Sequence, residues 1–129
     1  MPSQAVEDYL KTIYLLRQES SKVSMKELSR ALSVAPASAT GMVKKLAAEG
    51  LVKHERYQGV ELSEAGRHVA LEVLRHHRLI ELFLSKSLDV PWDLVHQEAE
   101  KLEHAISEEL EDRMAAALGN PQFEPHGAP

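Results

Sequence analysis

Residues 24–50 read SMKELSRALSVAPASATGMVKKLAAEG, and this stretch decides the fold. Ser24 and Glu27 have the spacing of a capping box, in which each side chain accepts a hydrogen bond from the other residue's amide, so a helix begins there. We expect the buried face of this helix to consist of Leu28, Ala31 and Leu32. After a short break, Pro36 suits the first position of a second helix, which Gly50 ends. Two short helices joined by a tight turn predict a helix-turn-helix.

The sequence on either side of this stretch predicts the rest of a winged helix. Upstream, apolar residues recur at positions i, i+4, i+7 and i+8 from Val6, which predicts an amphipathic helix running to about Arg17. Downstream, residues 51–55 and 60–62 predict two short strands around a turn at 56–59. A hairpin placed directly after the second helix is what a wing requires.

The second half of the chain predicts helices throughout. Ser63 suits the N-cap of a long helix reaching about residue 84, Pro91 opens another helix, and Gly119 ends the helical region. We therefore expect a mainly α-helical protein. Its expected parts are a winged helix-turn-helix domain over 1–72, an all-helical domain over 73–119 and an extended or disordered tail over 120–129.

Composition excludes several classes of protein. The 129 residues include 43% hydrophobic residues, enough for a real core, and no cysteine. Without cysteine there is no disulfide framework, no cysteine-based zinc finger and no thiolate nucleophile. The sequence contains neither a signal-peptide pattern nor an apolar run of about 18 residues, so we expect a soluble cytoplasmic protein with no membrane partner.

The net charge of −5 is unevenly distributed along the chain. Residues 1–62 carry nine Lys and Arg against seven Asp and Glu, whereas residues 63–129 carry six against thirteen. The first half is therefore mildly basic and the second strongly acidic. This asymmetry indicates one module for DNA and another that is either solvated or binds cations.

The helix that begins at Pro36 has the pattern of a recognition helix. Slender side chains at its first turns suit base edges, and the cations that follow suit phosphates. The candidates for base contact are Pro36, Ser38 and Thr40. The candidates for phosphate contact are Lys44, Lys45, Lys53 and Arg56. Gly41 in mid-helix suggests close approach to DNA or to another helix, although a tolerated glycine explains it equally well. A winged helix used for protein contact is the alternative for this half.

A helix over residues 91–106 would carry two adjacent arcs of side chains. Its packing seam would consist of Val95, Ala99, Leu102 and Ile106. The neighbouring arc would present two carboxylates and two imidazoles, those of His96, Glu100, Glu103 and His104. Neither carboxylate has a Lys or Arg three or four residues away, so their repulsion lacks a local cation. Such an oxygen and nitrogen donor set suits a first-row divalent metal.

A solvated stripe is the ordinary explanation for four polar residues on one helix face. Two features favour a metal instead. His77 and Glu81 form an i, i+4 pair on the preceding helix, which the short connection at 85–90 would fold back onto the helix over 91–106. Asp8 and Glu7 lie off the core stripe of the first helix, so three helices could supply ligands. We expect His54, His68, His76 and His126 to be solvated or locally hydrogen-bonded.

The chain resembles the diphtheria toxin repressor family of iron- and manganese-dependent regulators over almost all of residues 4–129. The matching stretches are Glu7-Asp8-Tyr9-Leu10 with Ile13-Tyr14, Gly50-Leu51-Val52, His77-Arg78-Leu79 with Glu81, and Val95-His96-Gln97-Glu98-Ala99 leading to Glu103-His104. The resemblance implies a homodimer whose second domain dimerises and binds metal. It also implies that metal clamps the first helix to the dimerisation helices.

Carried over position by position, the resemblance implies two metal sites. The primary site would consist of Asp8, Glu100, Glu103 and His104. The ancillary site would consist of His77, Glu81 and His96. Iron sensors of the family have methionine and cysteine where this chain has Asp8 and Glu100, and exchanging sulfur for carboxylate favours Mn²⁺. Fe²⁺ is the second choice, and Zn²⁺, Co²⁺ or Cd²⁺ could substitute.

Two departures qualify this resemblance. Lys11 stands where manganese transport regulators place a glutamate that joins two metals, which favours two separate sites, although His77 could serve either. Many members continue into a small C-terminal β-barrel after a segment resembling 125–129, so the tail resembles the start of a linker to such a barrel. Both a naturally short form and a fragment remain open.

The sequence therefore predicts a metal-dependent regulator that binds a pseudo-palindromic double-stranded DNA operator as a homodimer and represses metal-uptake genes. The alternative is a winged-helix regulator that answers a small organic ligand or a partner protein and binds no metal. A hydrolytic metalloenzyme is disfavoured because the sequence has no H-E-x-x-H motif and no nucleophile–base pair.

Overall fold

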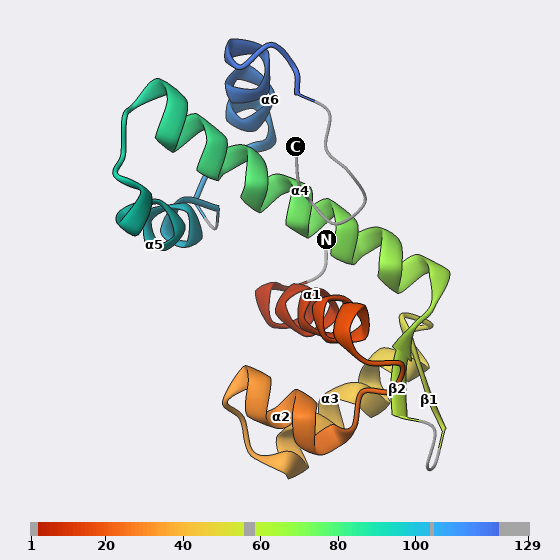
Figure 1. Ribbon diagram of the computed structural model, residues 1–129. Helices are drawn as coiled ribbons and strands as arrows, with labels where there is room; N and C mark the ends of the chain where they lie inside the picture. Colours follow the sequence, from red (N-terminus) through yellow and green to blue (C-terminus); the bar gives the residue numbers. More distant parts are fainter. Residues whose placement is uncertain (1–2, 56–58, 104, 122–129) are drawn as a thin grey trace. The chain divides into compact units, whose positions relative to one another are not determined.

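The computed structural model describes residues 3–55, 59–103 and 105–121. The chain divides into two compact units, Met1–Ala70 and Leu71–Pro129 (Figure 1). Each unit has buried hydrophobic side chains of its own. The fold is mainly helical with one two-stranded sheet, as the sequence predicts.

The first unit is a winged helix-turn-helix. It contains α1 (Gln4–Glu19), α2 (Met25–Leu32), α3 (Pro36–Ala48), the antiparallel strands β1 (Val52–Glu55) and β2 (Gly59–Leu62), and the first turns of α4 (Glu64–Ser87). Helix α1 contacts both α2 and β2, and α3 contacts α2 and β1. The largest fully buried side chains of this unit are Leu10, Ile13, Val23, Leu28, Val43, Leu46 and Val60.

The predicted start of α2 is confirmed. The Ser24 hydroxyl accepts from the Glu27 amide at 3.1 Å and the Glu27 carboxylate accepts from the Ser24 amide at 3.4 Å, which completes the capping box. Helix α2 ends at Ser33, whose φ of 56° lies in the left-handed region and turns the chain toward α3. The prediction that Ala31 is buried is wrong. Ala31 is exposed, and Ser29, whose hydroxyl donates to a backbone carbonyl, takes the buried position.

The hairpin differs from the prediction at two positions, because β1 begins at Val52 and not at Leu51, and Gly59 belongs to β2 and not to the turn. Val23, just before α2, forms an additional antiparallel bridge with Val60. Gly59 has φ +80°, and a Cβ there would lie 2.8 Å from the Val23 carbonyl oxygen. The close approach of this segment to β2 therefore requires glycine.

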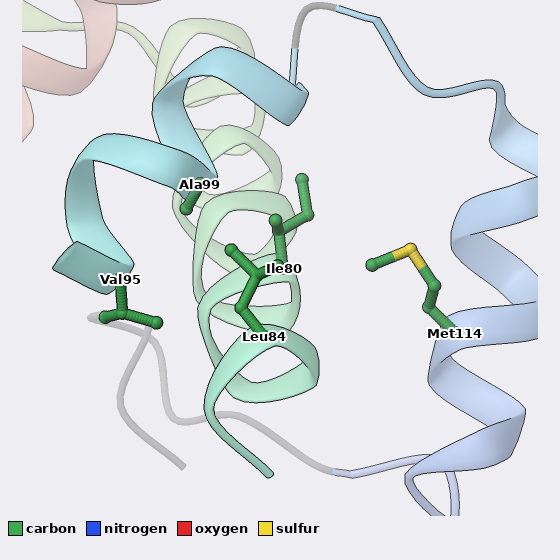
Figure 2. Close-up of a cluster of buried hydrophobic side chains, with 5 residues drawn as sticks. All are labelled: Ile80, Leu84, Val95, Ala99 and Met114. Carbon is green, nitrogen blue, oxygen red and sulfur yellow. The ribbon is translucent and has the colours of Figure 1, made fainter. Parts of the chain in front are cut away.

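The second unit is helical and consists of most of α4, with α5 (Trp92–Glu103) and α6 (Glu108–Ala117). Figure 2 shows Ile80 and Leu84 of α4 lying between Val95 and Ala99 of α5 and Met114 of α6. Leu102 and Ile106 are partly buried against the same cluster, so the predicted seam residues do pack together. The predicted helix over 91–106 is too long, because α5 ends at Glu103 and Ile106 lies beyond it. Burial of these side chains fixes which face of α5 meets α4.

Ser63 and Ser107 cap the helices that follow them. The Ser63 hydroxyl accepts from the Gly66 amide at 3.0 Å, and the Ser107 hydroxyl accepts from the Leu110 amide at 3.1 Å. The fourth helix runs to Ser87, three residues beyond the predicted end. In the described part of the chain, no helix combines the length and the apolar character that crossing a membrane would need.

Candidate metal centre and DNA-reading helix

Helix α3 presents the predicted DNA-contact residues on its surface. Ala39, Val43 and Leu46 are fully buried and set the inward face. Pro36, Ser38, Lys44 and Lys45 are exposed, Thr40 is half-buried, and Lys53 is exposed on β1. Arg56 lies outside the described residues. The small residues thus occupy the N-terminal turns and the cations follow, as a recognition helix requires.

Gly41 lies on the same exposed side of α3. A Cβ placed there would meet no atom within 4 Å in the described structure. The sequence suggests that Gly41 is approached closely either by DNA or by another helix. Among the described residues, no other helix of this unit lies close to a Cβ placed at Gly41. Contact with DNA and a glycine that the helix merely tolerates both agree with these open surroundings.

Three side chains from α4 and α5 converge in the second unit. Nε2 of His77 lies 3.2 Å from Nδ1 of His96 and 3.4 Å from Oε2 of Glu81. That carboxylate oxygen lies 3.2 Å from Nδ1 of His96. The three donor atoms therefore form a nearly equilateral triangle, which indicates a site that one cation could occupy.

The dimensions of this triangle fit a divalent transition metal. Donors bound at about 2.0–2.2 Å with angles between about 90° and 110° lie about 2.8–3.6 Å apart. The three observed separations fall inside that interval. Two imidazoles and one carboxylate are also a donor set that Mn²⁺, Fe²⁺ and Zn²⁺ accept. The residues present therefore fit a metal ion.

The triangle has one sheltered side and one open side. The side chains of His77 and Glu81 are 11% and 15% exposed, whereas that of His96 is 65% exposed. Arg78 contacts the second oxygen of Glu81 at 3.3 Å and so partly balances the carboxylate. Burial of two of the three side chains would limit competition from water for a bound ion, and the exposed imidazole leaves a path for an ion to enter.

Glu100 and Glu103 extend the cluster in different directions. Nε2 of His96 lies 3.2 Å from the half-exposed carboxylate of Glu100. Oε2 of Glu103, whose side chain is 9% exposed, lies 2.8 Å from Nδ1 of His77. Neither carboxylate has a Lys or Arg one turn away on α5, and each contacts an imidazole instead. Glu100 contacts His96 of α5, and Glu103 contacts His77 of α4.

The structure brings together five of the seven predicted ligands through direct contacts, namely His77, Glu81, His96, Glu100 and Glu103. Asp8 lies on α1 in the first unit, half-buried. His104 lies outside the described residues. The predicted division into a primary and an ancillary set is not apparent in these contacts, because Glu103 and Glu100 each contact a histidine of the ancillary set.

The expectation that His76 is solvated or locally bonded is wrong. Its Nδ1 forms an ion-pair contact with the carboxylate of Glu111 on α6, and both side chains are about one quarter exposed. The partner lies 35 positions further along the chain, so helical spacing within one element could not predict it. This contact joins α6 to α4 one position before His77.

Comparison with known families covers nearly the whole chain. Residues 1–60 match the N-terminal DNA-binding domain of iron-dependent repressors, and residues 63–129 match the metal-binding and dimerisation domain of iron-dependent repressors. The alternative of a regulator answering an organic ligand without metal does not agree with the second match.

Individual relatives agree with these matches. An uncharacterized HTH-type transcriptional regulator of Methanocaldococcus jannaschii is 39% identical over 87% of this chain and 90% of its own length. The HTH-type transcriptional regulator MntR of Geobacillus kaustophilus is 33% identical over 88% of this chain and 80% of its own.

Solved structures are similarly close in sequence and fold. A manganese-dependent transcriptional repressor in complex with manganese is 45% identical, with a TM-score of 0.81, and the match covers 96% of this chain. This chain spans 57% of the length of that structure. The resemblance found in the sequence is therefore confirmed: the chain belongs to the iron-dependent, or diphtheria toxin, repressor family, and is a metal-dependent DNA-binding transcriptional regulator and not an enzyme.

Proposed function

We propose that this regulator responds to Mn²⁺. The observation that carries the proposal is the oxygen and nitrogen triangle of His77, Glu81 and His96 in a chain without cysteine. Carboxylate oxygen is harder than the sulfur ligands that iron sensors of the family use, and hard donors suit Mn²⁺. The similar solved repressor, which is manganese-dependent, supports the same choice. Fe²⁺ is the second candidate, and Zn²⁺, Co²⁺ or Cd²⁺ could occupy the site in vitro.

We assign the ligands to two sites. The ancillary site consists of His77, Glu81 and His96. The primary site consists of Asp8, Glu100, Glu103 and His104. When bound, Mn²⁺ would supply positive charge and a fixed arrangement of donors. Asp8 belongs to the first unit and Glu100 to the second, so ligation by both would link the DNA-reading unit to the helical unit. Lys11, a cation on the same helix as Asp8, supports two separate sites over a closely spaced pair.

The regulated state is a homodimer on a pseudo-palindromic operator. Two α3 helices about 34–36 Å apart would enter successive major grooves. Pro36, Ser38 and Thr40 would contact bases, and Lys44, Lys45, Lys53 and Arg56 would contact phosphates. Neutralising the carboxylates of an acidic second half lowers its repulsion from DNA, which is one reason for metal to favour binding. Repression of metal-uptake genes follows as the expected role.

The test begins with a duplex enriched from a random DNA pool in the presence of Mn²⁺. Affinity of the full chain for that duplex should fall by about tenfold or more on chelation. Asp8→Ala should remove this metal dependence while the helical circular dichroism is unchanged. Glu19→Ala, which removes one exposed carboxylate from the same helix, is the matched control and should retain it. DNA affinity that is indifferent to Mn²⁺ in the unmodified chain would overturn the proposal.

Replacing Mn²⁺ with Fe²⁺ under anaerobic conditions addresses the choice of metal. The manganese assignment requires a tighter duplex complex with Mn²⁺ than with Fe²⁺ at equal free concentrations. The reverse order would make this chain an iron sensor with carboxylate ligands.

A further inference from the structure

Glu103 contacts His77, one of the three residues of the proposed ancillary site. It does so at Nδ1, the ring nitrogen that does not face Glu81 and His96. Its Oε2 lies 2.8 Å from Nδ1 of His77, and the two side chains are 9% and 11% exposed. An ionised carboxylate accepts hydrogen bonds and cannot donate one. With Glu103 ionised, the hydrogen of this contact would belong to Nδ1 of His77, which would donate it to Glu103. At 2.8 Å this contact is shorter than the 3.4 Å between Nε2 of His77 and the Glu81 carboxylate, so Nδ1 is the better placed donor.

This direction determines which atom His77 offers to a metal. A neutral imidazole carries one hydrogen, so a hydrogen held on Nδ1 leaves the lone pair on Nε2. Nε2 is the atom that faces Glu81 at 3.4 Å and His96 at 3.2 Å. If the hydrogen were on Nε2 instead, His77 would point a donor into the triangle and could not ligate there.

We propose that Glu103 is a positioning residue for the ancillary site, which acts by holding the His77 hydrogen on Nδ1. This role rests on the proposed function, because it presumes that the triangle binds a metal. A carboxylate behind a ligating histidine fixes the ring's orientation and raises its basicity. Glu103 is also assigned to the primary site, so one side chain belongs to both sites and connects them physically.

Two rival roles for Glu103 predict different results. If Glu103 acts only as a ligand of the primary site, removing it has no effect on the triangle once the primary site has been disabled. If Glu103 only fills buried space, a residue of similar size without an acceptor replaces it. A positioning role requires an acceptor at this place whether or not it is charged, so glutamine should largely restore what leucine loses.

The experiment uses the full chain carrying Asp8→Ala, in which the proposed primary site lacks a ligand, and Zn²⁺ as a diamagnetic probe. Glu103→Leu should weaken Zn²⁺ binding by about 10–100-fold, measured by competition with a chelator. Glu103→Gln should recover most of that loss because the amide oxygen still accepts from Nδ1. Glu98→Leu, on the same helix but with its carboxylate turned to Lys101 at 3.5 Å, is the control and should bind Zn²⁺ normally.

Long-range ¹H–¹⁵N spectra of the histidine rings give a readout that simple packing would not change. The parent should carry the His77 hydrogen on Nδ1 without metal and show the Nε2 resonance shifting when Zn²⁺ is added. Glu103→Leu should abolish the preference for Nδ1, and Glu103→Gln should retain it.

An unchanged Nδ1 preference in Glu103→Leu overturns the proposal, as does equal loss of Zn²⁺ affinity in the leucine and glutamine variants. Failure of the proposed function would give a different result from failure of the positioning role. The parent then binds no Zn²⁺ at the triangle, while the metal-free spectra still report whether Glu103 controls the His77 hydrogen.

Discussion

Replacing glycine with alanine should change the free energy of unfolding in opposite directions at Gly66 and at Gly41. Gly66 is buried in the first turn of α4, directly over the backbone of Leu51. A Cβ at position 66 would lie 1.9 Å from the Leu51 carbonyl oxygen, whereas ordinary contacts begin near 3.4 Å. Gly66→Ala therefore requires the start of α4 to move by about 1.5 Å, because the obstacle is backbone and cannot rotate away.

The hydrogen bonds that this movement would break set the size of the effect. Ser63 donates its amide to the Leu51 carbonyl at 3.0 Å and its hydroxyl to the Gly50 carbonyl at 2.6 Å, and caps α4 through the Gly66 amide. Each hydrogen bond contributes about 0.5–1.5 kcal/mol and the cap about 1 kcal/mol. Alanine returns about 1 kcal/mol through its helix propensity. We expect Gly66→Ala to lower the free energy of unfolding by about 1–3 kcal/mol.

Gly41→Ala is the matched control in α3. It gains the same helix propensity and meets no atom within 4 Å, so the free energy of unfolding should rise by about 0.5–1 kcal/mol. Urea denaturation of the metal-free chain, followed by circular dichroism, measures both changes. A neutral or stabilising Gly66→Ala would refute the argument that α4 needs glycine to approach Leu51. A destabilising Gly41→Ala would contradict the expectation that an added Cβ at position 41 meets no neighbouring atom.

Two further predictions concern the first unit. Burial raises the pKa of the Tyr9 phenol above its usual 10.0, so the neutral form is favoured in the folded state and its contribution to stability is complete below pH 10. That contribution should be lost as the pH rises through the raised pKa, and Tyr9→Phe should show a smaller loss of stability in urea titrations above pH 10. Lys44→Ala should weaken binding to all duplexes and lower the salt dependence, as the slope of log K against log salt, by about 1. An unchanged slope would remove Lys44 from the phosphate contacts.

The sequence alone predicted where helices such as α2 and α4 begin because the signals at helix starts are local. A capping box, a proline at a helix start and a serine N-cap each act within four residues, and the observed caps at Ser24, Ser63 and Ser107 follow that rule. The apolar period also identified the face of α5 that packs on α4. The error at Ala31 arose because a small apolar residue on a short helix can lie on either side of its stripe.

What the sequence determined is therefore the helix order, the wing, the packing face and the donor types available to a metal, since hydrogen bonds between near neighbours and a 3.6-residue period fix them. Tertiary structure decided which donors meet. His77 lies 26 positions before Glu103 and 19 before His96, and their contacts depend on how α4 and α5 are rotated against each other by their shared core. No local pattern encodes that rotation, which is why the sequence predicted Glu103 as a metal ligand but could not show its contact with His77.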